Sequence, residues 1–190
     1  MSYVALDFET ATGSHNSACA LGMVKFDGDS ILDEFYTLIN PPVVKFDLFN
    51  IGIHGIHQED VKDSPTFADI SGSVMAFIGD SVVMAHNAGF DLKVLKATAR
   101  YYGIELPDMD YICTWKLSKK LYPELPSRSL DSLARRIGFR FMHHNALEDA
   151  KACAAVFRRM EKELYPESIT SVIKPSRYCF RDFVMPYSQQ

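Results

Sequence analysis

The order of apolar and polar positions predicts a β-meander at the start of the chain. Alternation over residues 3–9, YVALDFE, places Asp7 and Glu9 on one face of a strand. The other face is wholly apolar and carries Val4, Leu6 and Phe8. Two more strand-like runs, 18–26 and 31–39, are separated by an Asp-Gly-Asp turn signal. We therefore expect three antiparallel strands.

Later segments alternate between strand and helix patterns. A buried strand is expected at 81–87, and a short strand followed by a helix within 111–123. Longer helices are expected at 66–78, 90–102, 129–138 and 146–164. The segment 50–61, NIGIHGIHQEDV, is expected to be a loop. This order predicts an α/β fold with a mixed five-stranded sheet, an antiparallel meander plus parallel strands, flanked by helices.

Length and composition indicate one domain. The 190 residues are 47% hydrophobic, which is enough for a single core. We expect that domain at 1–165, with an aromatic tail at 166–190 packed on it. The start, MSYVALD, lacks the features of a signal peptide, and the later apolar runs are too short to span a membrane. The four cysteines have no zinc or disulfide spacing, so a reduced, soluble, cytoplasmic protein without a membrane partner is expected.

Charge is divided unevenly along the chain. The net charge is −4, but residues 1–90 hold 3 basic and 12 acidic side chains, whereas residues 91–190 hold 17 and 12. The halves are therefore −9 and +5, which favours one face that holds cations and another that holds phosphates. Six basic residues of the second half are expected to contact phosphates: Lys116, Lys119, Lys120, Arg128, Arg135 and Arg136. Two solvated faces without any partner are the alternative.

Four carboxylates occupy positions where a hydrophobic residue or a neutral surface is expected. Asp7 and Glu9 project from one strand face, near enough to share a hard cation. Asp91 and Asp149 fall on the apolar stripes of their helices. Buried carboxylates need a compensating charge, and an oxygen-only ligand set suits magnesium or manganese rather than zinc. An exposed edge strand with solvated acids is the alternative for the first pair.

A histidine precedes the last long helix. Asn145 is a good N-cap residue for that helix, with Glu148 at its third position as in a capping box. His144 therefore lies outside the helix, where its ring is free to turn toward whatever Asp149 holds. A histidine beside a metal site is a natural general base. The adjacent His143 is assigned no role.

Three short stretches carry a resemblance to a known family. DFET (7–10), HNAGFD (86–91) and HNALEDA (144–150) resemble the three successive motifs of the DEDDh, or DnaQ-like, exonuclease superfamily, which includes DNA polymerase III epsilon-type domains. The resemblance implies a ribonuclease H-like fold and two divalent ions, Mg²⁺ or Mn²⁺. It also implies stepwise hydrolysis at the 3′ end that releases 5′ mononucleotides.

The motifs also imply roles for individual residues. By position, the metal ligands would be Asp7, Glu9, Asp91 and Asp149, and His144 would be the general base. Residues that resemble those shaping the pocket for the terminal nucleotide are Thr10, His54, Asn87 and Phe90. The polar loop 11–17 is longer than in many polymerase-bound members of the family.

The leading hypothesis is a 3′–5′ exonuclease acting on single-stranded DNA ends in proofreading or repair, alone or with a DNA polymerase. An exonuclease that trims RNA 3′ ends is a second reading, because the metals act on phosphate and the 2′-hydroxyl would decide. A catalytically silent nucleic-acid-binding module is a third. That reading predicts the loss of an acid or of His144, and the sequence retains all five.

Overall fold

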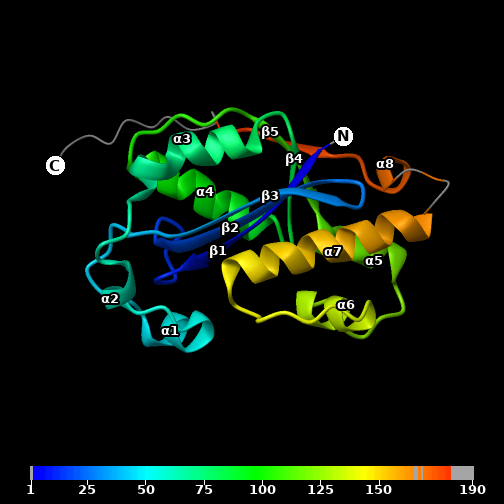
Figure 1. The fold of residues 1–190 in the computed structure, drawn as a ribbon, viewed down its shortest axis with the longest axis horizontal. Coiled ribbons are helices and arrows are strands. Elements are labelled where there is room, and N and C mark those ends of the chain that lie inside the picture. Colours follow the sequence, from blue (N-terminus) through cyan, green and yellow to red (C-terminus); the bar gives the residue numbers. More distant parts are fainter. Residues whose placement is uncertain (1, 165–166, 168, 181–190) are drawn as a thin grey trace.

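One mixed β-sheet runs through the centre of the protein, in a computed structural model that describes residues 2–164, 167 and 169–180 (Figure 1). Its strands, in spatial order, are β3 (Ser30–Leu38), β2 (Ala18–Asp27), β1 (Tyr3–Thr10), β4 (Val82–Ala85), β5 (Met109–Cys113) and β6 (Ser176–Tyr178). The pairs β1–β2, β2–β3 and β5–β6 are antiparallel, whereas β1–β4 and β4–β5 are parallel. The expected meander is thus joined through β1 to a parallel half.

Helices cover both faces of this sheet. One face carries α3 (Phe67–Ile78) and α4 (Gly89–Tyr101), and the other carries α5 (Thr114–Leu121), α6 (Leu130–Arg136) and α7 (Ala146–Leu164) (Figure 1). Within the described residues, three short helices complete the set: α1 (Leu48–His54), α2 (Gln58–Val61) and α8 (Ile169–Val172). No helix in the described part of the chain is long and apolar enough to cross a membrane.

Strand β1 separates two hydrophobic cores. Val4, Leu6 and Phe8 belong to the core beneath α3 and α4. Tyr3 and Ala5, on the opposite face, belong to the core beneath α7. The alternation read from the sequence is therefore confirmed, and it directs the acidic positions further along β1 toward the α7 side.

The structure corrects two expectations. In the described part of the chain the sheet has six strands rather than five, because three residues of the tail pair with β5 as β6. Such a short strand has no alternation to detect. The expected loop 50–61 contains most of α1 and all of α2. Since α1 buries none of its residues and includes Gly52, it lacks the apolar stripe by which a helix is identified. The end of the expected tail, 181–190, lies outside the described residues.

Helix α7 packs closely on the sheet near both of its ends. Toward its C-terminal end, the ring of Phe157 packs 4.9 Å from the ring of Tyr3 and 6.1 Å from that of Phe26, measured between centroids. At its start, the backbone of Ala146 passes directly over Gly22 of β2, where an added Cβ atom would overlap backbone atoms of Ala146 and Leu147. The absence of a side chain at Gly22 therefore permits α7 to begin against the sheet.

We expect Gly22→Ala to destabilise the protein by about 1–3 kcal/mol or more, because backbone on both sides must move to admit the methyl group. Urea denaturation, followed by circular dichroism, would measure the change. Gly72→Ala in α3 is the matched control, since nothing lies within 4 Å of its added Cβ. Removing a glycine from a helix interior should stabilise by about 0.5–1 kcal/mol. Equal stability of Gly22→Ala and wild type would contradict the close contact.

Candidate active site

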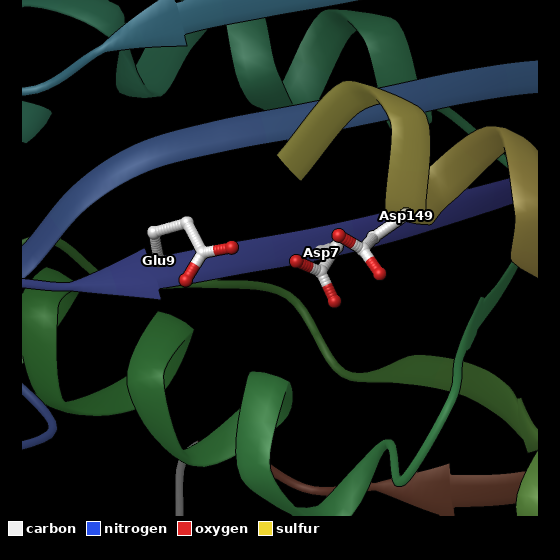
Figure 2. Close-up of side chains that lie close together, drawn as sticks. All are labelled: Asp7, Glu9 and Asp149. Carbon is white, nitrogen blue, oxygen red and sulfur yellow. The ribbon is translucent and has the colours of Figure 1, made fainter. Parts of the chain in front are cut away.

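Three carboxylates meet on the α7 side of β1 (Figure 2). Asp7, Glu9 and Asp149 each offer one oxygen atom, and these three atoms lie within 4.8 Å of one another. Glu9 and Asp149 are buried, with 8% and 3% of their surface exposed. Strand alternation supplies the first two side chains from neighbouring positions on one face, and α7 supplies the third from above.

The N-terminal cap of α7 determines where Asp149 lies relative to the sheet. The side-chain oxygen of Asn145 accepts a hydrogen bond from the backbone N–H of Glu148 at 3.2 Å, and its carbonyl oxygen accepts one from the N–H of Asp149 at 2.8 Å. The expected N-cap at Asn145 is therefore present. It starts the helix above Gly22, which pairs with Asp7 across β1 and β2. Asp149 is thereby brought over Asp7.

The fourth acid, Asp91, reaches the same place from the other layer. It lies in the first turn of α4, is 2% exposed, and its Oδ1 atom accepts a hydrogen bond from the backbone N–H of Phe8 at 3.1 Å. Asp91 is not one of the three residues with mutually close oxygens, but its charge raises the pKa of Asp7. All four predicted acids are therefore electrostatically linked.

Burial and mutual repulsion raise the pKa values of these carboxyls. Burial, followed by the charges of Asp149 and Asp91, raises the pKa of Glu9 to about 8. Burial likewise raises the pKa of Asp91 to about 7, against the lowering effect of its hydrogen bond from Phe8. The pKa of Asp7 lies well above its usual range for the same reasons, burial first. The cluster therefore resists holding all its negative charge without a cation.

The donor set fits divalent metal ions. Oδ2 of Asp149 is buried and has no hydrogen-bond partner among the described residues. A buried carboxylate oxygen without a partner is costly unless a ligand completes it. Clustered carboxylate oxygens, with no thiolate among them, are typical ligands for a hard cation.

The two histidines before α7 do not have equivalent contacts. Nδ1 of His143 lies 2.6 Å from Oδ1 of Asp149, whereas His144 stacks on the ring of His143 at 3.9 Å between centroids. Burial lowers the pKa of His144, which keeps its ring neutral near pH 7. The sequence motif predicts a role for His144 and none for His143. Spacing from Asn145 placed both outside the helix, but only the folded loop shows which ring touches Asp149.

A cleft of about 320 Å³ opens beside Glu9. Of the four residues expected to shape a nucleotide pocket, Thr10, His54 and Phe90 line this cleft, and Asn87 does not. Two exposed aromatic rings line it: Phe90 is 39% exposed, and Phe49, which belongs to none of the three sequence motifs, is 77% exposed. The cleft thus combines a carboxylate edge with apolar walls.

His54 also holds the end of β1 in place. Its Nε2 atom lies 3.1 Å from the carbonyl oxygen of Thr10, and its Nδ1 atom accepts a hydrogen bond from the N–H of Ile56 at 3.0 Å. A carbonyl only accepts, so Nε2 carries the proton and the ring is neutral. The side-chain amide of Asn50 donates to the same Thr10 carbonyl at 2.8 Å. Helix α1 therefore braces the strand that carries Glu9.

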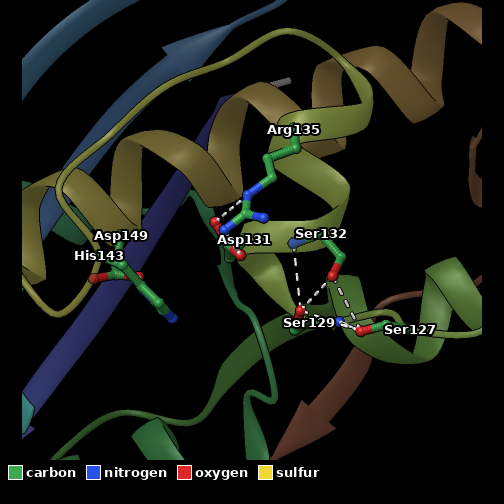
Figure 3. Close-up of polar contacts among 7 residues, drawn as sticks. All are labelled: Ser127, Ser129, Asp131, Ser132, Arg135, His143 and Asp149. Atoms are coloured by element: carbon green, nitrogen blue, oxygen red, sulfur yellow. Dashed lines mark hydrogen bonds and ion pairs between the residues drawn. The ribbon is translucent and has the colours of Figure 1, made fainter.

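Most of the basic residues expected to contact phosphates have partners within the protein. Two of them lie over aromatic rings, Lys119 over Trp115 and Arg136 over Tyr122. Two donate to backbone carbonyls, Lys120 to Val172 and Arg128 to Tyr122 and Pro123. Arg135 forms an ion pair with Asp131. The Arg135–Asp131 pair is drawn in Figure 3 beside the hydrogen-bonded Ser127, Ser129 and Ser132 at the start of α6. The Arg135 side chain is nevertheless 77% exposed, and contact of these residues with phosphates stays a prediction.

Comparison with known proteins agrees with this geometry. Residues 4–157 match the exonuclease family RNase T. The chain is 34% identical over 174 residues to a PolC-type DNA polymerase III of Caldanaerobacter subterraneus subsp. tengcongensis, an alignment that covers 90% of this chain and 12% of the polymerase. The chain thus spans about an eighth of the length of that relative.

Solved structures show the same fold. Exonuclease X in complex with 5′ overhanging duplex DNA has a TM-score of 0.73 and 22% identity, covering 90% of this chain and 96% of that one. The nuclease domain of 3′hExo, a DEDDh family member bound to rAMP, has a TM-score of 0.74 and 19% identity, covering 85% and 92%. The ribonuclease H-like fold expected from the motifs is confirmed.

We expect Glu9→Gln to stabilise the metal-free protein by roughly 1 kcal/mol or more at pH 8. The folded pKa of Glu9 is raised from 4.5 to about 8, so the native state binds more protons than the unfolded state between these values. Wild-type stability should therefore fall as pH rises through that window, and the variant should lose part of this slope. Thermal unfolding in chelator at several pH values would measure it.

Two observations check this prediction. Glu59→Gln is the control, since its side chain is 82% exposed and its loss should leave the pH slope unchanged. Adding Mn²⁺ should reverse the order of stability, because the wild type binds the cation more tightly and gains more. A variant with the wild-type slope would mean that ionisation of the buried Glu9 does not limit stability.

Proposed function

The chain belongs to the RNase T exonuclease family, as a DnaQ-like exonuclease of the DEDDh type. We propose that it uses two divalent cations to hydrolyse the terminal phosphodiester at the 3′ ends of single-stranded DNA. The observation that carries this proposal is the carboxylate cluster, one half-buried and two buried side chains, beside an open cleft. Mg²⁺ and Mn²⁺ suit such oxygen ligands. The products would be 5′ mononucleotides.

Each acidic residue has a place in this chemistry. Asp7, Glu9 and Asp149 would hold the cations between β1 and α7, with Asp91 completing the set from α4. When bound, two cations would lower the pKa of an attacking water and neutralise the charge that develops on the phosphate. The orphaned Oδ2 of Asp149 supports its assignment as a ligand.

His144 would take the proton from the attacking water. It stands next to the residue that contacts Asp149, and burial lowers its pKa so that the ring is neutral and able to accept a proton. Its backbone has a positive φ of 65°, which is strained for a residue with a side chain. Strained backbone of this kind gathers at functional sites.

The cleft beside Glu9 would receive the terminal nucleotide. Phe90 and Phe49 present exposed rings on which a base can stack, at about 1–3 kcal/mol per stacked base. Thr10 and His54 line the same cleft. Stacking requires unpaired bases, which favours a single-stranded end.

A DNA polymerase is the partner we infer for this activity. The relative described above is a PolC-type polymerase, within which the matching part makes up about an eighth of the length. This supports DNA rather than RNA as the substrate and a proofreading role. Action on RNA 3′ ends is the competing outcome of the test below.

We expect the protein to shorten 5′-labelled single-stranded DNA from its 3′ end in the presence of Mg²⁺, giving a ladder of products, and to stop when a chelator is added. Matched duplex DNA and RNA of the same sequence are the comparisons, with product lengths read from a gel. Faster trimming of RNA would overturn the substrate assignment. Binding without any cleavage would indicate a catalytically silent module instead.

We expect His144→Ala to lower turnover by about 10²- to 10⁴-fold, which is the usual contribution of a positioned general base. Excess Mn²⁺ should not restore it. The wild-type rate should rise with pH and level off below neutrality, because the lowered pKa leaves the ring neutral early in the titration. Single-turnover rates between pH 5 and 8 would test this. A variant with wild-type turnover and pH dependence would exclude His144 as the base.

A further inference from the structure

The Asp149 carboxylate has two oxygens in different situations. Oδ1 lies 2.6 Å from Nδ1 of His143 (Figure 3), while Oδ2 is buried without a hydrogen-bond partner among the described residues. The Asp149 side chain is 4% exposed and that of His143 is 40% exposed. His143 therefore reaches in from the surface to hold one oxygen of a buried group.

This contact fixes the proton on His143 and the orientation of Asp149. Burial raises the pKa of Asp149, but a carboxyl group that binds a cation must be ionised, and an ionised carboxylate only accepts hydrogen bonds, so in that state Nδ1 carries a hydrogen. Rotation about the last bond of an aspartate side chain is otherwise broad. A short bond to Oδ1 restricts that rotation and leaves Oδ2 as the oxygen available to a cation.

Neighbouring rings hold His143 in this position. His144 stacks on it, with centroids 3.9 Å apart and planes at 18°, and the Phe141 ring meets it edge-on at 5.4 Å. The positive φ of His144 turns the backbone at this point. The loop before α7 therefore supports the His143 ring from two sides.

Building on the function proposed above, we propose that His143 is a positioning residue for the metal site, which holds Oδ1 of Asp149 so that Oδ2 is presented to the cation. The tandem histidines then have separate tasks. Partners of this kind around metal-ligating side chains typically contribute about 10- to 100-fold in metal affinity. His143 would act through Asp149 without touching the substrate.

Calorimetric titration of Mn²⁺ into the protein without nucleic acid tests this role. We expect His143→Ala to weaken Mn²⁺ binding by about 10- to 100-fold. His143→Asn should recover most of the affinity, because its amide nitrogen is attached to Cγ as Nδ1 is and can donate to Oδ1. His143→Gln is the matched control: its amide lies one carbon further out, so it should bind as weakly as the alanine variant. His144→Ala, which loses the stacked ring but keeps the Phe141 support, should weaken Mn²⁺ binding less than His143→Ala does.

A kinetic measurement separates the two histidines. For His143→Ala, the Mn²⁺ concentration that gives half-maximal cleavage should rise about 10- to 100-fold, with turnover restored at saturating metal. His144→Ala should remain slow at any metal concentration. Wild-type affinity in His143→Ala, or asparagine no better than glutamine, would overturn the positioning role alone. A wild type that binds no Mn²⁺ would overturn the proposed function as well.

Discussion

The burial of Glu9, Asp91 and Asp149 close to one another, with the half-buried Asp7 beside them, is the constraint on which the rest of the structure depends. Burial raises the pKa of Glu9 to about 8 and that of Asp91 to about 7, so holding these groups ionised in the folded, metal-free protein is unfavourable. The fold must therefore supply rigidity from elsewhere. Two hydrophobic cores, one on each side of β1, clamp the strand that carries Asp7 and Glu9.

The two layers of helices each contribute one acid to this strand. Asp91 comes from α4, and its Oδ1 atom accepts the N–H of Phe8, a residue between the two acids of β1. Asp149 comes from α7, which reaches the sheet only because Gly22 has no side chain. Displacing either helix would change the distances within the cluster. The site is therefore a property of how the layers meet, and the packing of both cores is coupled to it.

Backbone strain gathers at the same place. Among the described residues other than glycine, positive φ angles occur only at Asn87, 74°, and His144, 65°. Asn87 lies four residues before Asp91, and His144 lies five residues before Asp149. Each turn therefore precedes the helix that delivers an acid. Strain of roughly 1–3 kcal/mol persists only where the surrounding structure holds it, as the two packed layers do here.

The sequence by itself determined the strand alternation of β1, the helix from Ala146 to Leu164 and the four acids, because each depends on local periodicity or short motifs. It did not reveal β6, α1 or α2, which are too short to leave a pattern. The sequence motif also predicts a role for His144 alone, and it gives no sign that His143 contacts Asp149. Only the tertiary structure decided that contact, the bracing of Thr10 by His54, and the passage of α7 over Gly22. Each of these contacts joins residues that are far apart in sequence or that are brought together by the path of a loop. Such contacts follow from tertiary packing rather than from local conformational preference.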